Sequence, residues 1–350
     1  MALLRPPRLG KSARIAARAR SQAGDLRPLR DRHRRLSLAT RPPLDLVTGA
    51  FSYSGSYIAQ RLLHAGRGVR TLSFHPDRPH PLQASVQAFP YRFDDPAALR
   101  RTLEGVSTLY NTYWVRFDHG QTSFEQAIER SDALFTAARQ AGVDRIVHLS
   151  ITNASITSPL PYFRGKALVE DALARVGVPY SIVRPTMIFG GDRDVLVNNI
   201  AWILRRMPVF AVPGSGGYPV QPIDVEDLAR ICTDAAEAGE NEVIDAAGPE
   251  TMPFGQLVAL IRRGIGARAR IVHVPAPIMT LAARALGLVV HDVVLTPHEI
   301  EGLMAGLLVS HEPPLGQTRF TDWLDHNATS IGRRYANELQ RHFASSPKVD

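Results

Sequence analysis

The chain has 350 residues, of which 45% are hydrophobic and 21% are charged, and its formal net charge is +8 at pH 7. This length and apolar content are those of a globular, enzyme-sized protein that can bury a sizeable core. Cys232 is the only cysteine, which excludes an intramolecular disulfide and favours a reducing compartment.

The basic charge is concentrated at the beginning of the chain. Residues 1–42 contain eleven Arg and one Lys against Asp25 and Asp31, a net charge of +10, so the other residues together carry −2. With no aromatic residue and no sustained apolar face, residues 1–42 are expected to form a disordered basic extension. Three interpretations stay open: a dispensable extension or misassigned start, a targeting segment, and an anion-binding arm. Because no aromatic residues stand between the arginines, we expect no nucleic-acid partner.

From Leu44 onward, short apolar runs alternate with stretches of helix length, a pattern typical of parallel βαβ units. Strands are predicted at 46–47, 69–74, 88–93, 108–113, 145–150 and 180–183. Helices are predicted between them, among others at 56–65, 96–103 and 124–140. Residues suited to capping stand at the helix ends: Asp94 and Asp95 before Pro96, and Gly66, Gly142 and Gly177 after helical stretches.

After Gly190 the alternation loosens. Helices are predicted at 195–206, from 225 onward and at 254–264, with the glycine-rich loop "PGSGGYPVQPID" between the first two. We therefore predict an α/β fold, a Rossmann-type doubly wound parallel sheet with a smaller C-terminal α+β lobe. The expected divisions are the extension 1–42, the Rossmann domain 43–190 with its sheet completed by later segments, and the smaller substrate lobe with C-terminal helices 191–350.

The first strand and the first helix are joined by a turn rich in small residues, "TGAFSYSG". In a doubly wound sheet this turn lies at the carboxyl edge, where a helix N-terminus binds a dinucleotide pyrophosphate. Gly49 permits the tight turn, and Gly55 permits close packing of the helix on the strand. Ser52 stands where a third glycine is expected, although the hydroxyls of Ser52, Ser54 and Ser56 could donate to phosphate oxygens. The alternative is an ordinary turn whose glycines serve geometry only.

Further motifs follow in order: "LYNTY", "IVHLSIT", "YFRGK", "IVRPTMIFG" and "QPIDVEDLA". With "TGAFSYSG", over about Leu44 to Gly264, they resemble the short-chain dehydrogenase/reductase superfamily in its NAD-dependent epimerase/dehydratase-like and NmrA-like branch. The resemblance implies an NAD(P)-dependent oxidoreductase or epimerase-like enzyme acting on a small hydroxyl, carbonyl or sugar-nucleotide substrate. In layout the chain is also similar to the nucleotide-binding accessory subunit of respiratory complex I. That similarity implies the alternative, a non-catalytic NADP(H)-binding protein that senses redox state or stabilises an assembly.

The resemblance also implies where a nicotinamide dinucleotide would bind. NAD sites place an acid at the end of the second strand, whereas this chain has Ser73 and Phe74 there, so NADP is favoured over NAD. His75 or Arg78 could reach a 2′-phosphate, or either could be a solvated loop residue. Arg92 stands where relatives place an acid for adenine, and Asp94 could substitute only if the loop shifts. The expected cofactor contacts are Thr48, Gly49, Ser52, Tyr53, Ser54, Gly55, Ser73, Phe74, His75, Asn111, Thr112, Lys166, Arg184 and Pro185.

Tyr162 and Lys166, in "PYFRGK", are four residues apart on a helix predicted to begin at Pro159 or Pro161, so both project from one face. A neighbouring ammonium favours phenolate and lowers the pKa of a phenol. The resemblance implies that Tyr162 is the catalytic acid/base and that Lys166 binds the cofactor ribose. It further implies that Thr152, or alternatively Ser150, holds the substrate oxygen. The interval from Thr152 to Tyr162 is shorter than in the epimerases, as in branches where catalysis is lost; Tyr162 would then only pack against the cofactor.

Several other side chains have simpler predicted roles. Tyr113, Trp114 and Phe117 could roof an apolar or ring-shaped substrate or close the interface between the lobes. Helix capping is expected of Asp224 and Asp227. Arg205, Arg206 and Arg262 could bind the diphosphate of a sugar nucleotide or could equally be solvated helix surface.

The remaining predictions concern partners and location. The twelve histidines lack metal-ligand spacing, so we expect no metal site. Residues 278–290 form the most apolar late stretch; it is too short and too charged to span a bilayer, although a peripheral membrane contact through it stays open. We expect a small-molecule substrate, a cytoplasmic location and, as is common in the superfamily, pairing into a homodimer.

Overall fold

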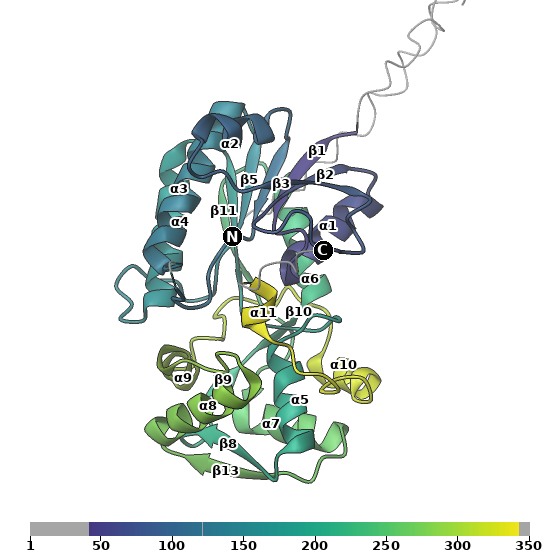
Figure 1. Ribbon diagram of the computed structural model, residues 1–350, viewed down its shortest axis with the longest axis vertical. Helices are drawn as coiled ribbons and strands as arrows, with labels where there is room; N and C mark the ends of the chain where they lie inside the picture. Colours follow the sequence, from purple (N-terminus) through teal and green to yellow (C-terminus); the bar gives the residue numbers. More distant parts are fainter. Residues whose placement is uncertain (1–41, 121, 343–350) are drawn as a thin grey trace, which may run out of the picture. The chain divides into compact units, whose positions relative to one another are not determined.

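The computed structural model describes residues 42–120 and 122–342. The predicted basic extension, residues 1–42, lies outside them except for Pro42. The described residues belong to one compact unit, Pro42–Asp350. Its elements are shown in Figure 1.

A seven-stranded parallel sheet forms the core of the first lobe, in the order β11-β6-β5-β4-β1-β2-β3. The six predicted strands are present with shifted ends, and a strand from the later chain adds the seventh. The chain crosses from β3 back to β4 beside β1, which is the strand order of a doubly wound sheet. This confirms the predicted α/β Rossmann-type fold. The strands are β1 (Leu44–Thr48), β2 (Gly68–Ser73), β3 (Val86–Pro90), β4 (Thr108–Asn111), β5 (Arg145–Leu149), β6 (Tyr180–Pro185) and β11 (Glu242–Ala246).

Helices cover both faces of this sheet because successive strand residues point to opposite sides. Leu46 packs in the core under α2 (Pro96–Leu103), α3 (Phe124–Ala141) and α4 (Pro161–Val176). The next residue, Val47, packs in the core under α1 (Tyr53–His64) and α6 (Val225–Asp234). Figure 1 shows α2, α3 and α4 on one side of the strands and α1 with α6 on the other.

Helix ends follow the predicted capping chemistry. Asp95 accepts a hydrogen bond from the Ala98 amide, with Pro96 in the first turn of α2. Gly142 and Gly177 take left-handed conformations after α3 and α4, with φ of 76° and 78°. Asp224 caps α6, as predicted, by accepting from the amides of Glu226 and Asp227. The Asp227 carboxylate instead accepts from the amides of residues 317 and 318 in the C-terminal chain.

A second lobe has its own apolar core. Three helices enclose this core: α5 (Leu196–Arg206), α7 (Phe254–Gly264) and α10 (Phe320–Asn327). Strand β8 (Val209–Pro213) pairs in parallel with β13 (Arg270–Val274). The smaller elements are β7 (Met187–Phe189) paired with β10 (Pro222–Asp224), β9 (Pro219–Val220) paired with β12 (Met252–Pro253), and helices α8 (Ala276–Val290), α9 (Pro297–Met304) and α11 (Glu338–His342).

Two arginines of α5 hold the C-terminal chain, although Arg206 is also exposed to solvent, as predicted. The Arg205 guanidinium donates to the carbonyls of Ala328, Ile331 and Ile265, and the Arg206 guanidinium donates to those of residues 332 and 333. Five donors on a planar fork suit such a cluster of carbonyls. Arg262, on α7, likewise donates to the Ala269 carbonyl.

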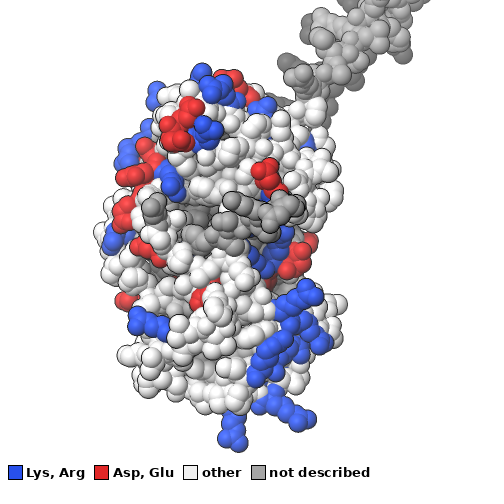
Figure 2. Space-filling model, in the orientation of Figure 1, with Lys and Arg blue, Asp and Glu red and all other residues white. Residues whose placement is uncertain are grey.

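Helix α8 presents apolar side chains to solvent. Ile278, Leu281, Leu288 and Val289 are each at least 54% exposed. In Figure 2 the face of the second lobe around α8 carries few charged side chains. Within residues 42–120 and 122–342, no helix has the length and apolar content needed to cross a membrane.

Candidate functional site

A cavity of about 1500 Å³ lies at the carboxyl ends of the central strands and extends into the second lobe. It is lined by most of the residues predicted to bind a dinucleotide or to catalyse. Those on its wall are Thr48, Gly49, Ser52, Tyr53, Ser54, Ser73, Phe74, His75, Thr112, Ser150, Tyr162, Lys166 and Pro185. Four predicted residues are not on the wall: Gly55, Asn111, Thr152 and Arg184.

The turn after β1 places the N-terminus of α1 at the cavity. Gly49 has φ +68°, a conformation that glycine adopts without strain. At Gly55 an added Cβ would lie 2.2 Å from the Gly49 carbonyl oxygen, so only glycine allows the helix to pack this closely on the strand. The helix begins at Tyr53, three residues before the predicted start at Ser56. The turn is therefore short, and Gly55 lies inside the helix.

Two of the three serine hydroxyls predicted to bind phosphate donate within the turn instead. Ser52 Oγ donates to the Gly49 carbonyl at 2.6 Å, and Ser56 Oγ donates to the Tyr53 carbonyl at 2.8 Å. Both hydroxyl protons are therefore directed at the backbone in this structure. Ser54 lines the cavity, beside the first amides of α1.

Aromatic rings occupy the region after β2 and β3. Phe74 packs against Tyr91 with ring centroids 4.6 Å apart, and the Arg130 guanidinium lies 5.7 Å from the Phe74 ring centroid. Phe74 is 52% exposed, so it has an open face at the cavity edge. The side chains of Arg92 and Asp94 form a 3.8 Å ion pair in solvent and do not line the cavity.

Buried hydrogen bonds of Asn111 fix the end of β4. Asn111 is fully buried; its Oδ1 accepts from the Thr48 hydroxyl at 3.2 Å, and its amide contacts His148 Nδ1 at 3.1 Å. Burial lowers the pKa of His148 well below its usual value, so the imidazole is neutral. Asn111 therefore fixes the backbone, and Thr112, the next residue, reaches the cavity wall.

Lys166 is buried at the back of the cavity. Its Nζ donates to the Leu149 carbonyl at 2.7 Å and lies 4.9 Å from the centroid of the Trp114 ring. Burial lowers the pKa of Lys166 to about 7, although the Glu170 carboxylate opposes the shift. Trp114 reaches this position because α4 has Gly165 there: a Cβ would lie 2.8 Å from the tip of the indole.

Tyr162 stands among aromatic rings and lines the cavity. Its ring meets Trp114 edge-on at 5.9 Å and Phe124 at 6.2 Å. Burial raises the pKa of Tyr162 above its usual value, and the Glu299 carboxylate adds to this shift. The shift is opposite to the lowering that the pairing with Lys166 predicts, because desolvation of the phenolate is the largest cause and outweighs the attraction of the Arg116 guanidinium.

The other hydroxyls predicted to act in catalysis have protein partners. Ser150 Oγ donates to the Glu170 carboxylate, which also forms a two-bond ion pair with Arg184. Thr152 is fully buried, and its Oγ1 lies 3.3 Å from an Asp245 carboxylate oxygen on β11. Arg184, predicted to contact the cofactor, ties β6 to α4 in this structure.

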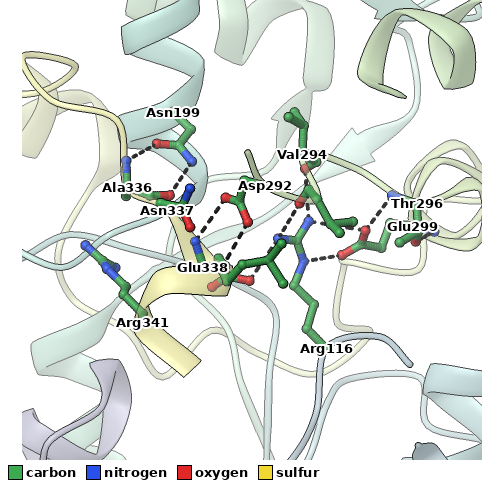
Figure 3. Close-up of polar contacts among 12 residues, drawn as sticks. Arg116, Asn199, Asp292, Val294, Thr296, Glu299, Ala336, Asn337, Glu338 and Arg341 are labelled. Atoms are coloured by element: carbon green, nitrogen blue, oxygen red, sulfur yellow. Dashed lines mark hydrogen bonds and ion pairs between the residues drawn. The ribbon is translucent and has the colours of Figure 1, made fainter. Parts of the chain in front are cut away.

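Charged residues from distant parts of the chain complete the cavity wall. Arg116, after β4, forms ion pairs with Glu299 on α9 and Glu338 on α11, at 2.5 and 2.8 Å (Figure 3). Arg193 and Arg341 line the wall near the Gly49–Gly55 turn. None of these five residues was predicted, because no spacing pattern in the sequence relates residues that come together only when the second lobe and the C-terminal chain fold back.

The chain resembles known proteins in sequence and in fold. The sequence profile of the family described as NmrA-like matches residues 46–288. The mitochondrial "NADH dehydrogenase [ubiquinone] 1 alpha subcomplex subunit 9" of Arabidopsis thaliana is 24% identical over 259 residues, 71% of this chain and 64% of that protein. The match thus spans less than two thirds of that relative's length.

Two further proteins are informative. A "(4-alkanoyl-5-oxo-2,5-dihydrofuran-3-yl)methyl phosphate reductase" of Streptomyces griseus subsp. griseus is 29% identical over 226 residues, 63% of this chain and 73% of that protein. The crystal structure of the Citrobacter sp. triphenylmethane reductase complexed with NADP(H) superposes with a TM-score of 0.67 at 18% identity, covering 81% of this chain and 99% of that chain. At this identity the structural likeness shows a shared fold.

Proposed function

This chain belongs to the NmrA-like family, and from that membership we propose that it is an NADP(H)-dependent oxidoreductase acting on a small, largely apolar carbonyl compound. The observation that carries the proposal is the cavity. It joins the N-terminus of α1, a site suited to a pyrophosphate, to an apolar chamber in the second lobe.

The residues around the turn fit a dinucleotide. The cradle between Gly49 and α1 exists because position 55 has no side chain, and backbone amides at the start of a helix attract phosphate. Thr48, Ser52, Tyr53 and Ser54 would surround the pyrophosphate. This fit supports cofactor binding independently of any relative.

A phosphorylated ribose suits the end of β2 better than a bare ribose does. NAD sites place a carboxylate there, and this chain has Ser73, whose Oγ accepts from the His75 amide at 3.0 Å. His75 and Arg78 both line the cavity on this side and would lie near a 2′-phosphate. Phe74 and Tyr91 offer an aromatic surface on which an adenine could stack.

The chamber beyond the turn suits an apolar second ligand. The whole cavity, at about 1500 Å³, exceeds common single-ligand pockets, which run to about 1,000 Å³, so a cofactor and a substrate would fit together. Apolar side chains line the second-lobe part of the wall, namely Ile188, Ile200, Ile203, Phe210, Met279, Leu295 and Leu303.

A bound dinucleotide supplies or accepts a hydride. The Tyr162 hydroxyl is protonated at neutral pH and would be placed to donate to a carbonyl oxygen; its raised pKa makes it a weaker acid than a free phenol, so the proton transfer would depend on a bound cofactor lowering that pKa. Lys166 holds the Leu149 carbonyl and would face the cofactor ribose. Trp114 and Phe124 pack edge-on against the Tyr162 ring and hold it at the cavity wall.

A second candidate function is non-catalytic NADP(H) binding. It is favoured by one observation: the hydroxyls of Ser150 and Thr152 are engaged by Glu170 and Asp245 and do not present a substrate-holding proton to the cavity. The complex I subunit among the relatives belongs to an assembly by its name. Sugar-nucleotide chemistry has less support, because Arg205, Arg206 and Arg262 bind backbone carbonyls.

One experiment separates these candidates. We would titrate the full chain with NADPH and NADH, then follow NADPH absorbance with a panel of quinones, aldehydes and ketones. If the chain is an oxidoreductase, turnover should fall at least about tenfold in Tyr162→Phe. A general acid ordinarily contributes more than this factor to the rate. Tyr180→Phe, at the start of β6 away from the cavity, is the matched control and should behave like the wild type. Tight NADPH binding without turnover on any substrate would support the non-catalytic candidate.

A further inference from the structure

We propose that Arg193 and Arg341 form a clamp for the pyrophosphate of the dinucleotide, beside the Gly49–Gly55 turn. The proposal rests on the proposed function and makes the C-terminal helix α11 a part of the cofactor site. Neither arginine belongs to a motif in the sequence.

Arg193 is held directly over the glycine turn. It lies in the loop between β7 and α5, and its Nη1 donates to the Phe51 carbonyl at 2.6 Å. The loop is fixed on both sides: Tyr53 Oη donates to the Gly190 carbonyl at 2.7 Å, and the buried Asp194 carboxylate accepts from the amides of Gly190 and Val197. The guanidinium thus stands beside the same residues that a pyrophosphate would contact.

Arg341 is brought to the same place by the C-terminal chain. Its Nη1 donates to the Arg193 carbonyl at 2.8 Å, and its own carbonyl accepts from the Arg78 guanidinium. Arg78 follows β2, near the position proposed for the 2′-phosphate. Arg341 therefore lies between the two phosphate positions of the proposed cofactor.

Helix α11 is anchored independently of any ligand. The Asp292 carboxylate accepts from the amides of Glu338 and Leu339 at 3.0 and 3.1 Å, and Glu338 pairs with Arg116. Asn199 exchanges two hydrogen bonds with the backbone of Ala336. Figure 3 shows Arg341 on the other side of this segment from Arg116, so the anchor and the clamp occupy different sides.

Among the described residues the clamp has no carboxylate at ion-pair distance, although the carboxylates of Glu338, Asp192 and Asp194 attract the Arg341 guanidinium at longer range. Neither Arg193 nor Arg341 forms an ion pair with a carboxylate within residues 42–120 and 122–342; their hydrogen bonds go to carbonyls. The buried Asp194 carboxylate is engaged by the Gly190 and Val197 amides. Two neighbouring guanidinium groups repel each other, and an anion with several oxygens would offset that repulsion while accepting from both forks.

The test compares full-length variants by calorimetric titration with NADPH and with NADH. Arg193→Gln and Arg341→Gln should each weaken binding of both coenzymes about tenfold or more and by the same factor, since the pyrophosphate is common to both. Arg193→Lys and Arg341→Lys keep the positive charge but lose the planar guanidinium. Their affinities for both coenzymes should lie between those of the wild type and the Gln variants. Arg100→Gln, on exposed α2, is the matched control and should bind like the wild type. Thermal melts of each variant check the fold.

Three outcomes would overturn the clamp. If wild-type protein binds NADPH and neither Gln variant weakens it, the clamp fails while the proposed function stands. A loss for NADPH alone would assign the arginines to the 2′-phosphate and refute the pyrophosphate role. If the wild type binds neither coenzyme, the proposed function fails and the clamp with it.

Inorganic pyrophosphate should also compete with NADPH less effectively in Arg341→Gln than in the wild type.

Discussion

The substitution Gly55→Ala tests the geometry on which the whole site depends. At this position in α1 the new Cβ would lie 2.2 Å from the Gly49 carbonyl oxygen and 2.8 Å from the Gly49 carbonyl carbon. An ordinary contact begins at about 3.4 Å, so α1 and the end of β1 must separate by roughly 1 Å. The obstacle is backbone, which cannot rotate away as a side chain could.

The expected change in stability combines two effects. Overpacking of a tight contact costs about 1–3 kcal/mol, and a backbone obstacle places this substitution at the upper end. Alanine in place of glycine inside a helix returns at most about 1 kcal/mol. The net loss in the free energy of unfolding is about 2 kcal/mol, a fall of roughly 4–8 °C in Tm at about 2–4 °C per kcal/mol.

The assay is thermal unfolding followed by titration with NADPH. Gly239→Ala is the control, because its Cβ would meet no atom within 4 Å. We expect the control to melt like the wild type and Gly55→Ala to lose both stability and at least about tenfold in NADPH affinity, because the phosphate cradle opens. If Gly55→Ala melts and binds like the control, the close helix–strand contact does not exist and the argument for the cradle fails.

Two further predictions concern buried charge. The pKa of Lys166 is about 7 in the folded chain, below its unfolded value of 10.5, so above pH 7 the unfolded state binds more protons and stability rises with pH. In urea unfolding, the free energy of unfolding of the wild type, compared with that of Lys166→Met, should rise by about 2 kcal/mol between pH 7 and pH 9. If the difference between the two proteins is the same at both pH values, Lys166 is not a buried amine with a lowered pKa. Arg116→Met leaves the carboxylates of Glu299 and Glu338 without their guanidinium and should cost about 2 kcal/mol, against under about 0.5 for Arg100→Met at an exposed pair. If Arg116→Met and Arg100→Met lower the free energy of unfolding equally, the Arg116 ion pairs stabilise the fold no more than an exposed pair does.

Local patterns in the sequence predicted the sheet, the turn and the caps. Leu46 and Val47 are adjacent apolar residues of a strand buried on both faces, and Gly49 with Gly55 marks the turn. These features depend on neighbours within a few residues, so periodicity and glycine spacing were sufficient. The pairing of Tyr162 with Lys166 on one helix was predictable for the same reason, although their pKa values were not.

The tertiary structure decided what each polar group does. Ser150, Thr152 and Arg184 stand at the positions that the motifs indicate, yet Glu170 on α4 and Asp245 on β11 take their hydrogen bonds. Location in the cytoplasm, pairing into a dimer and a membrane contact through α8 stay predictions.

The sequence by itself therefore determined the strands, the helices and the glycine turn, because backbone conformation and alternating burial are set over a few residues. Only the folded chain decided that Arg116, Arg193 and Arg341 meet at one cavity, and that burial moves the pKa of Lys166 down and that of Tyr162 up. Desolvation and charge act through space, and the carboxylates that raise the pKa of Tyr162 belong to Glu299 and Glu338, which are far from it in the sequence.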